Sequence, residues 1–424
     1  MKKILVVLLV LAAATGVFAQ EGEWSLSGNV EIGAIVDFTT DTKDDITVGG
    51  STWNLPYNGW GPIHGFLGIG YQRDQLFVGL DFHTQDDNFL RGNVYYDAGN
   101  YALQAQSNLL DFFKGTNDNE HRLWGYYKLL NEMVTLEAAY QARDTEFWVS
   151  DTTGAFQRYV KSNWSHGNPL NEQPWGPSFT FSHTDGDGKG NIGLNYLLAN
   201  VNLSNLEFGV ILPKLFSGYR DGKDGSSTNL LEDVMKNALL GFKFTMQPIE
   251  VAAQFQMGNY GVYFGGKWFI GPVTAGLSFN GILNPDDPNK KMRFGGGVEY
   301  NPGVFGAWIK AFYAMNGPTA DRDTQIGIEP GFFYNVIPSH LQFRTNVGFY
   351  FSGGKSGGDK VDLEVGWAVQ PELFWNFLGT GAGSYWAYGT GMIVRYRLLS
   401  DDNATRSSRM GKTNALDVNF KFSF

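Results

Sequence analysis

Trp24 to Phe38 reads WSLSGNVEIGAIVDF and alternates between two kinds of side chain over its whole length. Its even-numbered positions are almost all apolar, whereas its odd-numbered positions are mostly polar and include Glu31 and Asp37. Successive side chains of an extended strand point to opposite faces, so a period of two indicates a strand. The stretch therefore predicts a strand with one apolar and one polar face.

The same alternation recurs through the rest of the chain. It is clearest at 76–82, 134–140, 249–257 and 416–424. No apolar run approaches the ~20 residues of a membrane-spanning helix after residue 19. A chain with 55 Gly, 33 Phe and 12 Trp fits a barrel wall, where glycine relieves crowding and aromatic side chains mark the membrane interfaces. The pattern predicts an all-β transmembrane barrel of antiparallel, up-and-down strands.

The first 19 residues have the pattern of a cleavable export signal. Lys2 and Lys3 precede an apolar run from Ile4 to Ala14, and the small residue Ala19 suits the cleavage site. The run is too short to span a membrane. We therefore expect residues 1–19 to be a signal peptide and 20–424 to form one barrel domain, because no linker or change in composition divides it.

Charge and cysteine content exclude several classes of protein. Without Lys2 and Lys3 the chain has 30 basic and 42 acidic side chains, a net charge of −12. This balance argues against a nucleic-acid partner and favours cations in a pore. The chain has no cysteine, which excludes disulfides, thiolate metal sites, cysteine nucleophiles and a lipid anchor on cysteine.

The C-terminal strand carries a family resemblance. Leu416, Val418, Phe420, Phe422 and Phe424 share one face, and the chain ends on that last aromatic residue. This ending resembles the assembly signal of bacterial outer-membrane proteins, with Phe420, Phe422 and Phe424 as its aromatic positions. Together with the export signal and the alternation, the whole chain resembles the porin-like barrels of that membrane. The resemblance implies an outer-membrane location and an encounter with the barrel assembly machinery.

Turn chemistry predicts about twenty strands, within a range of about 18 to 22, joined by short periplasmic turns and longer extracellular loops. Short connections are expected at 72–74, 97–100, 130–132, 200–202, 247–248, 271–272, 301–303, 335–339 and 379–384. Longer polar loops are expected at 40–64, 111–120, 144–189, 213–236, 284–291, 314–323 and 398–412.

Pro371 interrupts the segment 361–377, yet the apolar phase continues past it. We therefore expect one long strand there, with a local bulge.

The longest loop, 144–189, is too long for an ordinary connection and is expected to have a function. It either folds into the lumen as a constriction or forms an extracellular flap. Its aromatic residues Trp148, Tyr159, Trp164 and Trp175 are candidates for contact with a solute.

Charged residues on the predicted inner face are the main functional signal. So many buried charges of both signs would be prohibitive in a dry core, so they indicate a wet interior. Opposed acids and bases across a pore would also create a transverse field. The predicted pore-lining residues are Glu31, Asp37, Glu137, Arg143, Glu207, Arg293, Glu299, Lys310, Arg344, Asp362, Glu364, Arg395 and Arg397.

Other motifs give no catalytic or metal site. Asp185 to Lys189 resembles a calcium loop but has lysine at a ligand position and lacks the distal glutamate. The run Gly295 to Gly297 precedes no helix, so glycine there is expected to relieve crowding in the wall. The six histidines show no metal-ligand spacing. No cofactor, metal or catalytic residue is therefore expected.

The sequence predicts an outer-membrane channel for passive diffusion of small hydrophilic solutes, with a mild bias towards cations. Two alternatives stay open: a surface adhesin or antigen on a barrel mount, and a substrate-specific outer-membrane channel. The expected partners are outer-membrane lipid, the assembly machinery and small solutes. The sequence predicts no particular oligomeric state.

Overall fold

The computed structural model describes the strands and most of the short turns that join them. The described residues are 22–37, 46–49, 64–84, 89–109, 122–140, 196–213, 238–257, 260–283, 292–315, 324–356, 359–378, 390–399 and 414–423. Their strands are β1 (Glu23–Asp37), β2 (Ile46–Gly49), β3 (His64–Arg73), β4 (Leu76–Thr84), β5 (Phe89–Asp97), β6 (Tyr101–Asn108), β7 (Arg122–Leu129), β8 (Val134–Tyr140), β9 (Tyr196–Leu203), β10 (Leu206–Pro213), β11 (Leu239–Met246), β12 (Ile249–Gln256), β13 (Gly261–Ile270), β14 (Val273–Ile282), β15 (Met292–Tyr300), β16 (Phe305–Met315), β17 (Thr324–Ile337), β18 (Leu341–Ser356), β19 (Asp359–Asn376), β20 (Gly391–Leu399) and β21 (Asn414–Ser423).

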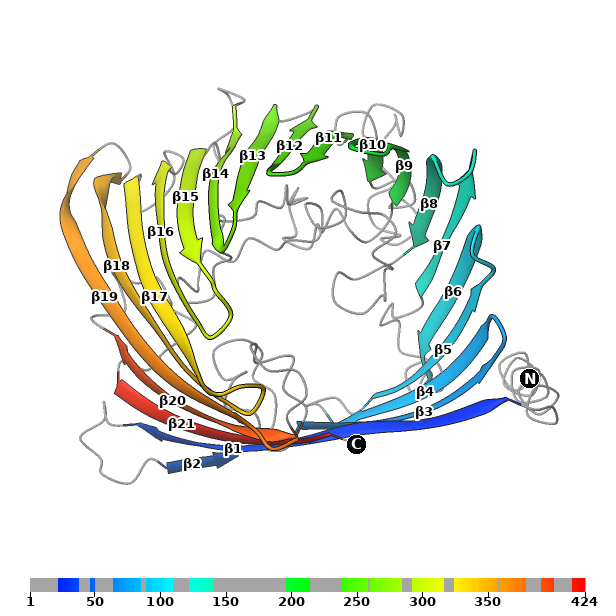
Figure 1. Cartoon of the computed structure of the whole chain (residues 1–424), viewed down its shortest axis with the longest axis horizontal. Helices are drawn as coiled ribbons and strands as arrows, with labels where there is room; N and C mark the ends of the chain where they lie inside the picture. Colours follow the sequence, from blue (N-terminus) through cyan, green and yellow to red (C-terminus); the bar gives the residue numbers. More distant parts are fainter. Residues whose placement is uncertain are drawn as a thin grey trace.

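The strands close into a ring, which confirms the predicted barrel (Figure 1). From β3 onwards each strand pairs antiparallel with the next, and β21 returns to pair with β1 along Asn29–Asp37. The other edge of β1 pairs with β3 along Glu23–Glu31. Since each strand has a neighbour on both sides, no edge of the main wall is left open to pair with another chain.

The short strand β2 is an addition to this ring. It pairs with Gly33–Val36 of β1, on the stretch beyond the residues that β3 covers. The described residues contain 21 strands, so the closed wall without β2 has twenty, as predicted. The interpretation of 40–64 as loop alone is wrong at Ile46–Gly49, because a four-residue strand is too short to show a period of two.

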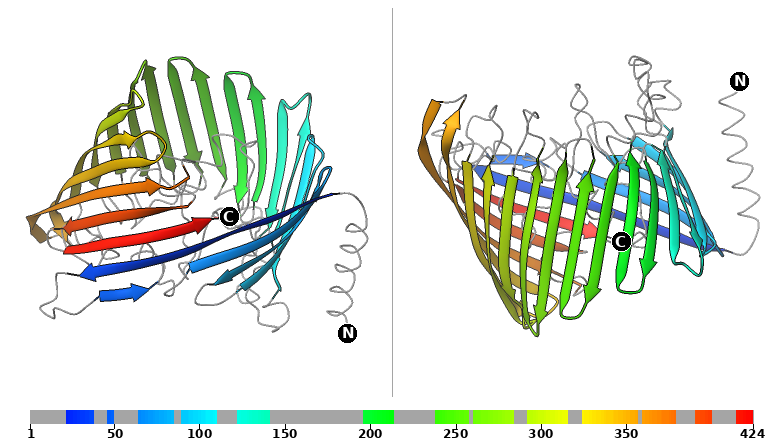
Figure 2. Two further views of the ribbon diagram at one scale, coloured as in Figure 1. Left: turned by 60° about the horizontal axis from the view of Figure 1, so that its bottom comes forward. Right: turned by 90° about the horizontal axis from the view of Figure 1, so that it is seen from above.

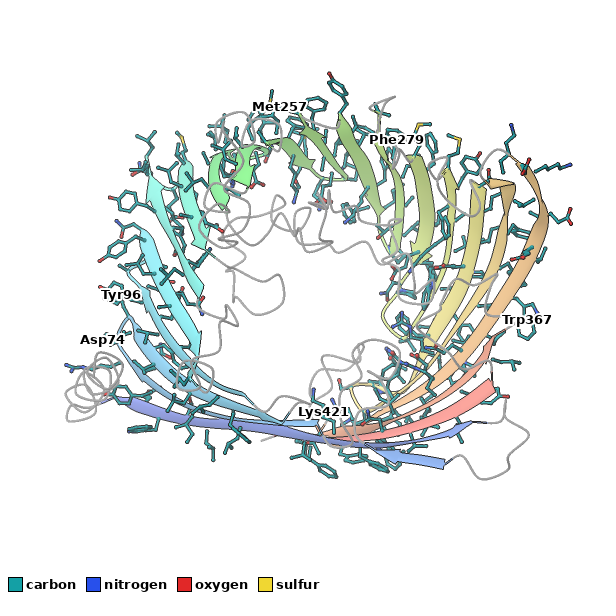
Figure 3. All side chains as sticks on the ribbon, turned by 180° about the vertical axis from the view of Figure 1, so that it is seen from behind. Asp74, Tyr96, Met257, Phe279, Trp367 and Lys421 are labelled. Atoms are coloured by element: carbon teal, nitrogen blue, oxygen red, sulfur yellow. The ribbon has the colours of Figure 1, made fainter. Side chains whose placement is uncertain are left out.

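The wall has an apolar outer face and a polar inner face. Leu26, Leu103 and Leu277 lie on the outer face and are each more than 60% exposed. Figure 3 shows Tyr96 and Trp367 pointing away from the ring and Lys421 pointing into it. Leaving large apolar side chains in water costs about 1.5–3 kcal/mol each relative to burial, so this belt requires an apolar surrounding. The fold is that of an outer-membrane β-barrel.

Short turns join most strand pairs at one end of the barrel. They lie at Asp74-Gln75, Gln247-Pro248 and Gly271-Pro272, among others, and several use a left-handed backbone, as at Asp74 with φ 49°. The turn expected at 200–202 is wrong. Those residues lie inside β9, and the chain turns instead at Ser204-Asn205. Asn200 and Asn202 suggest a turn by composition, but they are the inward positions of a regular strand.

The turn expected at 335–339 lies further along the chain, because β17 continues to Ile337 and the turn occupies 338–340. The connection expected at 379–384, and the loops 111–120 and 144–189, lie outside the described residues.

Pro371 lies within one uninterrupted strand, β19, as predicted, but the expected bulge is absent from its pairings. Pro371 pairs in register with Thr345 of β18, and the pairs of β19 with β20 keep one register on both sides of it. The ladder to β20 is interrupted only opposite Gln370 and Pro371. Proline lacks the N–H that would complete this ladder, and the surrounding pairs hold the register without an extra residue.

Strand lengths differ around the ring. β8 has 7 residues, whereas β18 has 16 and β19 has 18. At ~3.4 Å per residue, the long pair exceeds the ~25 Å height of an apolar belt even when tilted. Figure 2 shows the β18–β19 hairpin extending past its neighbours at the rim. In the part of the chain that the structure describes, no helix has the length and apolar character to cross a membrane.

Candidate functional site on the inner face

The pairing register places the predicted charged positions on one face of the wall, the face that carries Lys421. Side chains are described for Glu137, Glu207, Glu299, Lys310, Arg344, Asp362, Glu364 and Arg395. Glu31, Asp37, Arg293 and Arg397 occupy strand positions of the same phase, but nothing can be said of their side chains. The positions outside the described residues are Arg143, Trp148, Tyr159, Trp164, Trp175 and Phe424.

The aromatic positions of the C-terminal strand lie on the opposite face. Phe420 and Phe422 are 37% and 48% exposed on the outer belt. Phe420 pairs with Ile32 and Phe422 with Val30, so these aromatic residues lie at the seam where the last strand meets the first.

On β7 to β10, inner carboxylates accept hydrogen bonds from uncharged donors. The indole Nε1 of Trp124 donates to Glu137 at 2.9 Å, and the amide of Asn200 donates to Glu207 at 2.6 Å. Glu137 is 2% exposed and Glu207 is 9% exposed. Buried carboxylates need such donors because desolvation without them is costly. We define this region, with its acids held by neutral groups, as the acidic wall.

The acidic wall begins beside a cluster at a strand end. The carboxylate of Asp97 accepts hydrogen bonds from the hydroxyl of Tyr95 at 2.7 Å and from the hydroxyl of Tyr126 at 3.2 Å. It also accepts one from the backbone N–H of Gly99, at 2.7 Å, in a turn where Gly99 has a φ of 83°. Asp97 therefore joins β5 and β7 to the turn between β5 and β6.

Further along, β11 to β13 carry an inner set of paired charges. Glu250 lies between Lys243, at 3.5 Å, and Lys267, at 3.9 Å, with one carboxylate oxygen closest to each. The three residues come from adjacent strands: Glu250 is the register partner of Lys267, and Lys243 lies diagonally across from it. Here cations and anions compensate one another across the wall.

A buried ion pair lies on β19 and β20. Arg395 Nε is 2.6 Å from Glu372 Oε1, and the two side chains are 10% and 5% exposed. The amide of Gln370 also donates to that carboxylate oxygen. Arg395 and Glu372 are register partners, so strand pairing brings them together.

Next to this pair, an indole ring lies against the wall. Trp308 of β16 lies across Gly331 of β17, where an added Cβ would come within 2.4 Å of the ring. The guanidinium carbon of Arg344 lies 5.1 Å from the centroid of the Trp308 ring, and Lys310 Nζ lies 6.0 Å from it. Both distances lie within the range of cation–π attraction. We define the inner face of β16 to β20 around Trp308, Arg344 and Arg395 as the basic wall.

Sequence reasoning missed the residues that hold these charges in place. Trp124, Trp308, Glu372, Glu250 and Lys243 all share the inward phase of their strands, so alternation could have found them. Which of them meet, however, depends on the register between strands. Alternation within one strand does not contain that information.

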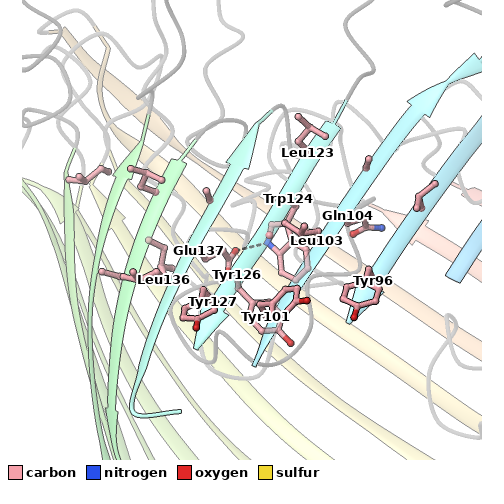
Figure 4. A pocket seen from close by; sticks show the side chains of 18 of the residues that line it. Tyr96, Tyr101, Leu103, Gln104, Leu123, Trp124, Tyr126, Tyr127, Leu136 and Glu137 are labelled. Atoms are coloured by element: carbon pink, nitrogen blue, oxygen red, sulfur yellow. Dashed lines mark hydrogen bonds between the residues drawn. The ribbon is translucent and has the colours of Figure 1, made fainter. Parts of the chain in front are cut away.

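A hollow of about 1250 Å³ lies on the outer side of the wall between β5 and β10 (Figure 4). Leu103, Leu123 and Leu136 line it, and Tyr101 and Tyr127 stack at 6.4 Å on one side. A Cβ added to Gly125 would come within 2.8 Å of Leu103, so glycine allows that leucine to lie close to the wall. Apolar residues of the outer belt form most of the lining of the hollow, and inward residues of the same strands, among them Trp124 and Glu137, also contribute to it.

Metal-ligating side chains do not gather on the described part of the chain: no group of three or more His, Cys, Asp or Glu residues there could hold an ion. The spacing of the six histidines predicted no metal site, and His166 and His183 lie in the segment 144–189, outside the described residues.

Comparison with known proteins gives structural neighbours alone. No protein-family model matches the chain, and no curated protein matches it in sequence. Among solved structures, the chain is similar to Salmonella typhi OmpF in complex with daunomycin, with 12% identity and a TM-score of 0.38 over 95% of this chain and 98% of that one. It is also similar to Pseudomonas aeruginosa OccK10 (OpdN), with 8% identity and a TM-score of 0.46 over 96% and 99%. The fold assignment itself rests on the strand pairing and the two faces of the wall.

Proposed function

We propose that the chain is an outer-membrane channel through which small hydrophilic solutes diffuse passively, with a mild preference for cations. The observation that carries the proposal is the closed ring of strands with an apolar outer belt and charges of both signs on its inner face. A belt of exposed leucine and aromatic residues suits lipid, and a charged interior suits water. Barrels of 16 to 18 strands already leave an aqueous channel, and this wall is at least as wide.

The inner charges support a selective interior. The acidic wall on β7 to β10 and the basic wall on β16 to β20 lie on different sides of the ring (Figure 1). The inner face of β16 to β20 also carries Glu329, Asp362 and Glu364, so charges of both signs lie close together there. Mixed charges of this kind create local fields in the lumen, which order water and favour dipolar solutes. The excess of acidic over basic residues in the chain adds a general attraction for cations.

Residues 1–19 would direct export, residues 20–424 would form the barrel domain, and the C-terminal strand would be read by the assembly machinery. The loop 144–189 would narrow the lumen or cap it from outside. Glu299, Asp362, Glu364 and the other predicted inner charges would line the pore.

The test is single-channel recording from protein lacking residues 1–19, refolded and inserted into a planar bilayer. We expect discrete, lasting open steps and a reversal potential in a salt gradient that shows a preference for cations. Folding is checked by protease resistance and by the slower gel mobility of unheated barrels. Folded, inserted protein without conductance would contradict the channel and favour a barrel that serves as a mount for adhesive loops.

A further inference from the structure

Arg344 differs in its surroundings from the inner cations that have a carboxylate partner. Its register partner on β19 is Glu372, the nearest carboxylate by strand order. That carboxylate, however, is bound to Arg395 and Gln370. Among the described residues, the Arg344 guanidinium lies against the face of the Trp308 ring. Its Nε is buried and has no hydrogen-bond partner among them.

Several other inner cations have a carboxylate close by. Lys243 and Lys267 share Glu250, and Lys128 lies 3.5 Å from Glu132. A guanidinium has five N–H donors in a planar fork, and the face of an aromatic ring satisfies none of them by hydrogen bonding. Arg344 therefore carries a charge and donors that the described protein groups around it do not neutralise.

Trp308 fixes where this charge lies. Gly331 lets the indole lie flat against β17, and the ring in turn supports the guanidinium from one side. A guanidinium held in this way has lost part of its rotational freedom before any ligand arrives. A partner that binds it therefore pays less of the ordering entropy.

We propose that Arg344, held on Trp308, is a binding site for the oxyanion of a solute, either a carboxylate or a phosphate group. Both groups match the guanidinium fork with two parallel N–H···O bonds. The inference rests on the channel proposed above and adds to it the substrate class: small anionic or zwitterionic solutes. In a pore that attracts cations overall, one such site would give a specific anion a point of contact.

The experiment measures block of the single-channel current by added sodium glutarate and, separately, by sodium phosphate, at constant ionic strength. We expect the wild-type barrel to show saturable block by at least one of them. Arg344→Gln should weaken this block about tenfold, the effect of losing a hydrogen-bonded charge contact. Arg344→Lys keeps the charge but loses the forked pair of N–H donors. Block of this variant should be weaker than block of the wild type and stronger than block of Arg344→Gln.

The matched control is Lys267→Gln, which removes the same charge from an inner cation that already has Glu250 as its partner. The added anions should block the current of the Lys267→Gln channel as strongly as that of the wild-type channel. Stronger block by glutarate than by phosphate assigns the site to carboxylates, and stronger block by phosphate assigns it to phosphorylated solutes. Equal block of wild type and Arg344→Gln, or equal losses in Arg344→Gln and Lys267→Gln, would overturn the inference.

Binding of anions at Arg344 can be tested even if the barrel does not conduct. If the folded wild-type barrel does not conduct, calorimetric titration of the same two anions into barrel folded in detergent still tests the site. Heat of binding that disappears in Arg344→Gln would support the site without the channel. No binding to the wild-type barrel would overturn it.

Discussion

The acidic wall and the basic wall stabilise their charges by different means. On β7 to β10, Glu137 and Glu207 accept hydrogen bonds from the neutral side chains of Trp124 and Asn200. On β16 to β20, Arg395 pairs with a carboxylate, whereas Arg344 lies over an indole ring. Neutral donors and aromatic faces leave the charge of the residue uncancelled, whereas an ion pair cancels it. Glu207 and Arg344 are therefore held in place by groups that leave their charges uncancelled.

The largest expected effect comes from breaking the ion pair of the basic wall. Glu372→Gln should lower the free energy of unfolding by about 3 kcal/mol, because it leaves Arg395 buried without an anion. The measurement is urea unfolding of the barrel in phospholipid vesicles. The double variant Glu372→Met with Arg395→Met should recover most of the loss, since it removes both charges. A single variant as stable as the wild type would mean that water solvates this pair.

The next effect tests the platform under Arg344. Gly331→Val should destabilise the barrel by about 2 kcal/mol, because a Cβ there overlaps the Trp308 ring. Gly271→Ala at an open turn is the control for a change of glycine, although its φ of 58° adds some strain of its own. Combining Gly331→Val with Trp308→Ala should cost less than the sum of the two single changes, because the overlap is then absent. If the two costs simply add, the cost of Gly331→Val comes from the strand and the ring is not responsible.

A smaller effect is expected on the acidic wall. Trp124→Phe removes the donor to Glu137 and should cost about 1.5 kcal/mol, the value of a hydrogen bond to a charged group. Tyr127→Phe, on the outer face, removes a hydroxyl from an aromatic residue and should change the same urea midpoint by much less. Equal shifts for the two variants would show that the bond to Glu137 adds no stability.

The smallest effect concerns selectivity and tests whether the acidic wall acts on ions. Glu207→Gln keeps an acceptor for Asn200 but removes a charge from the inner face. The ratio of cation to anion permeability should fall roughly twofold, the effect of less than ~1 kcal/mol in a wet lumen. Reversal potentials in a salt gradient measure it. Glu132→Gln, at an exposed turn, is the control, and an equal fall there would assign selectivity to overall charge.

Much of the wall followed from the sequence. The alternation of Trp24 to Phe38 matches β1 to within one residue at each end, and the phase that continues past Pro371 correctly predicted a single long strand. Alternation works here because each side chain faces either the apolar belt or the interior, which is a local property. Turn composition was less reliable, since Asn200 and Asn202 belong to a strand.

What the sequence by itself determined is the kind of wall: its two faces, its approximate strand number and the mixed charge of its interior. These depend on the order of side chains along one strand and on the free energy of moving each from water to an apolar surrounding. The tertiary structure alone decided which charges meet. Glu372 bonds to Arg395 while Arg344 lies on Trp308, because the register of the five neighbouring strands β16 to β20 sets those distances. Residues so far apart along the chain become neighbours only once the strands have paired.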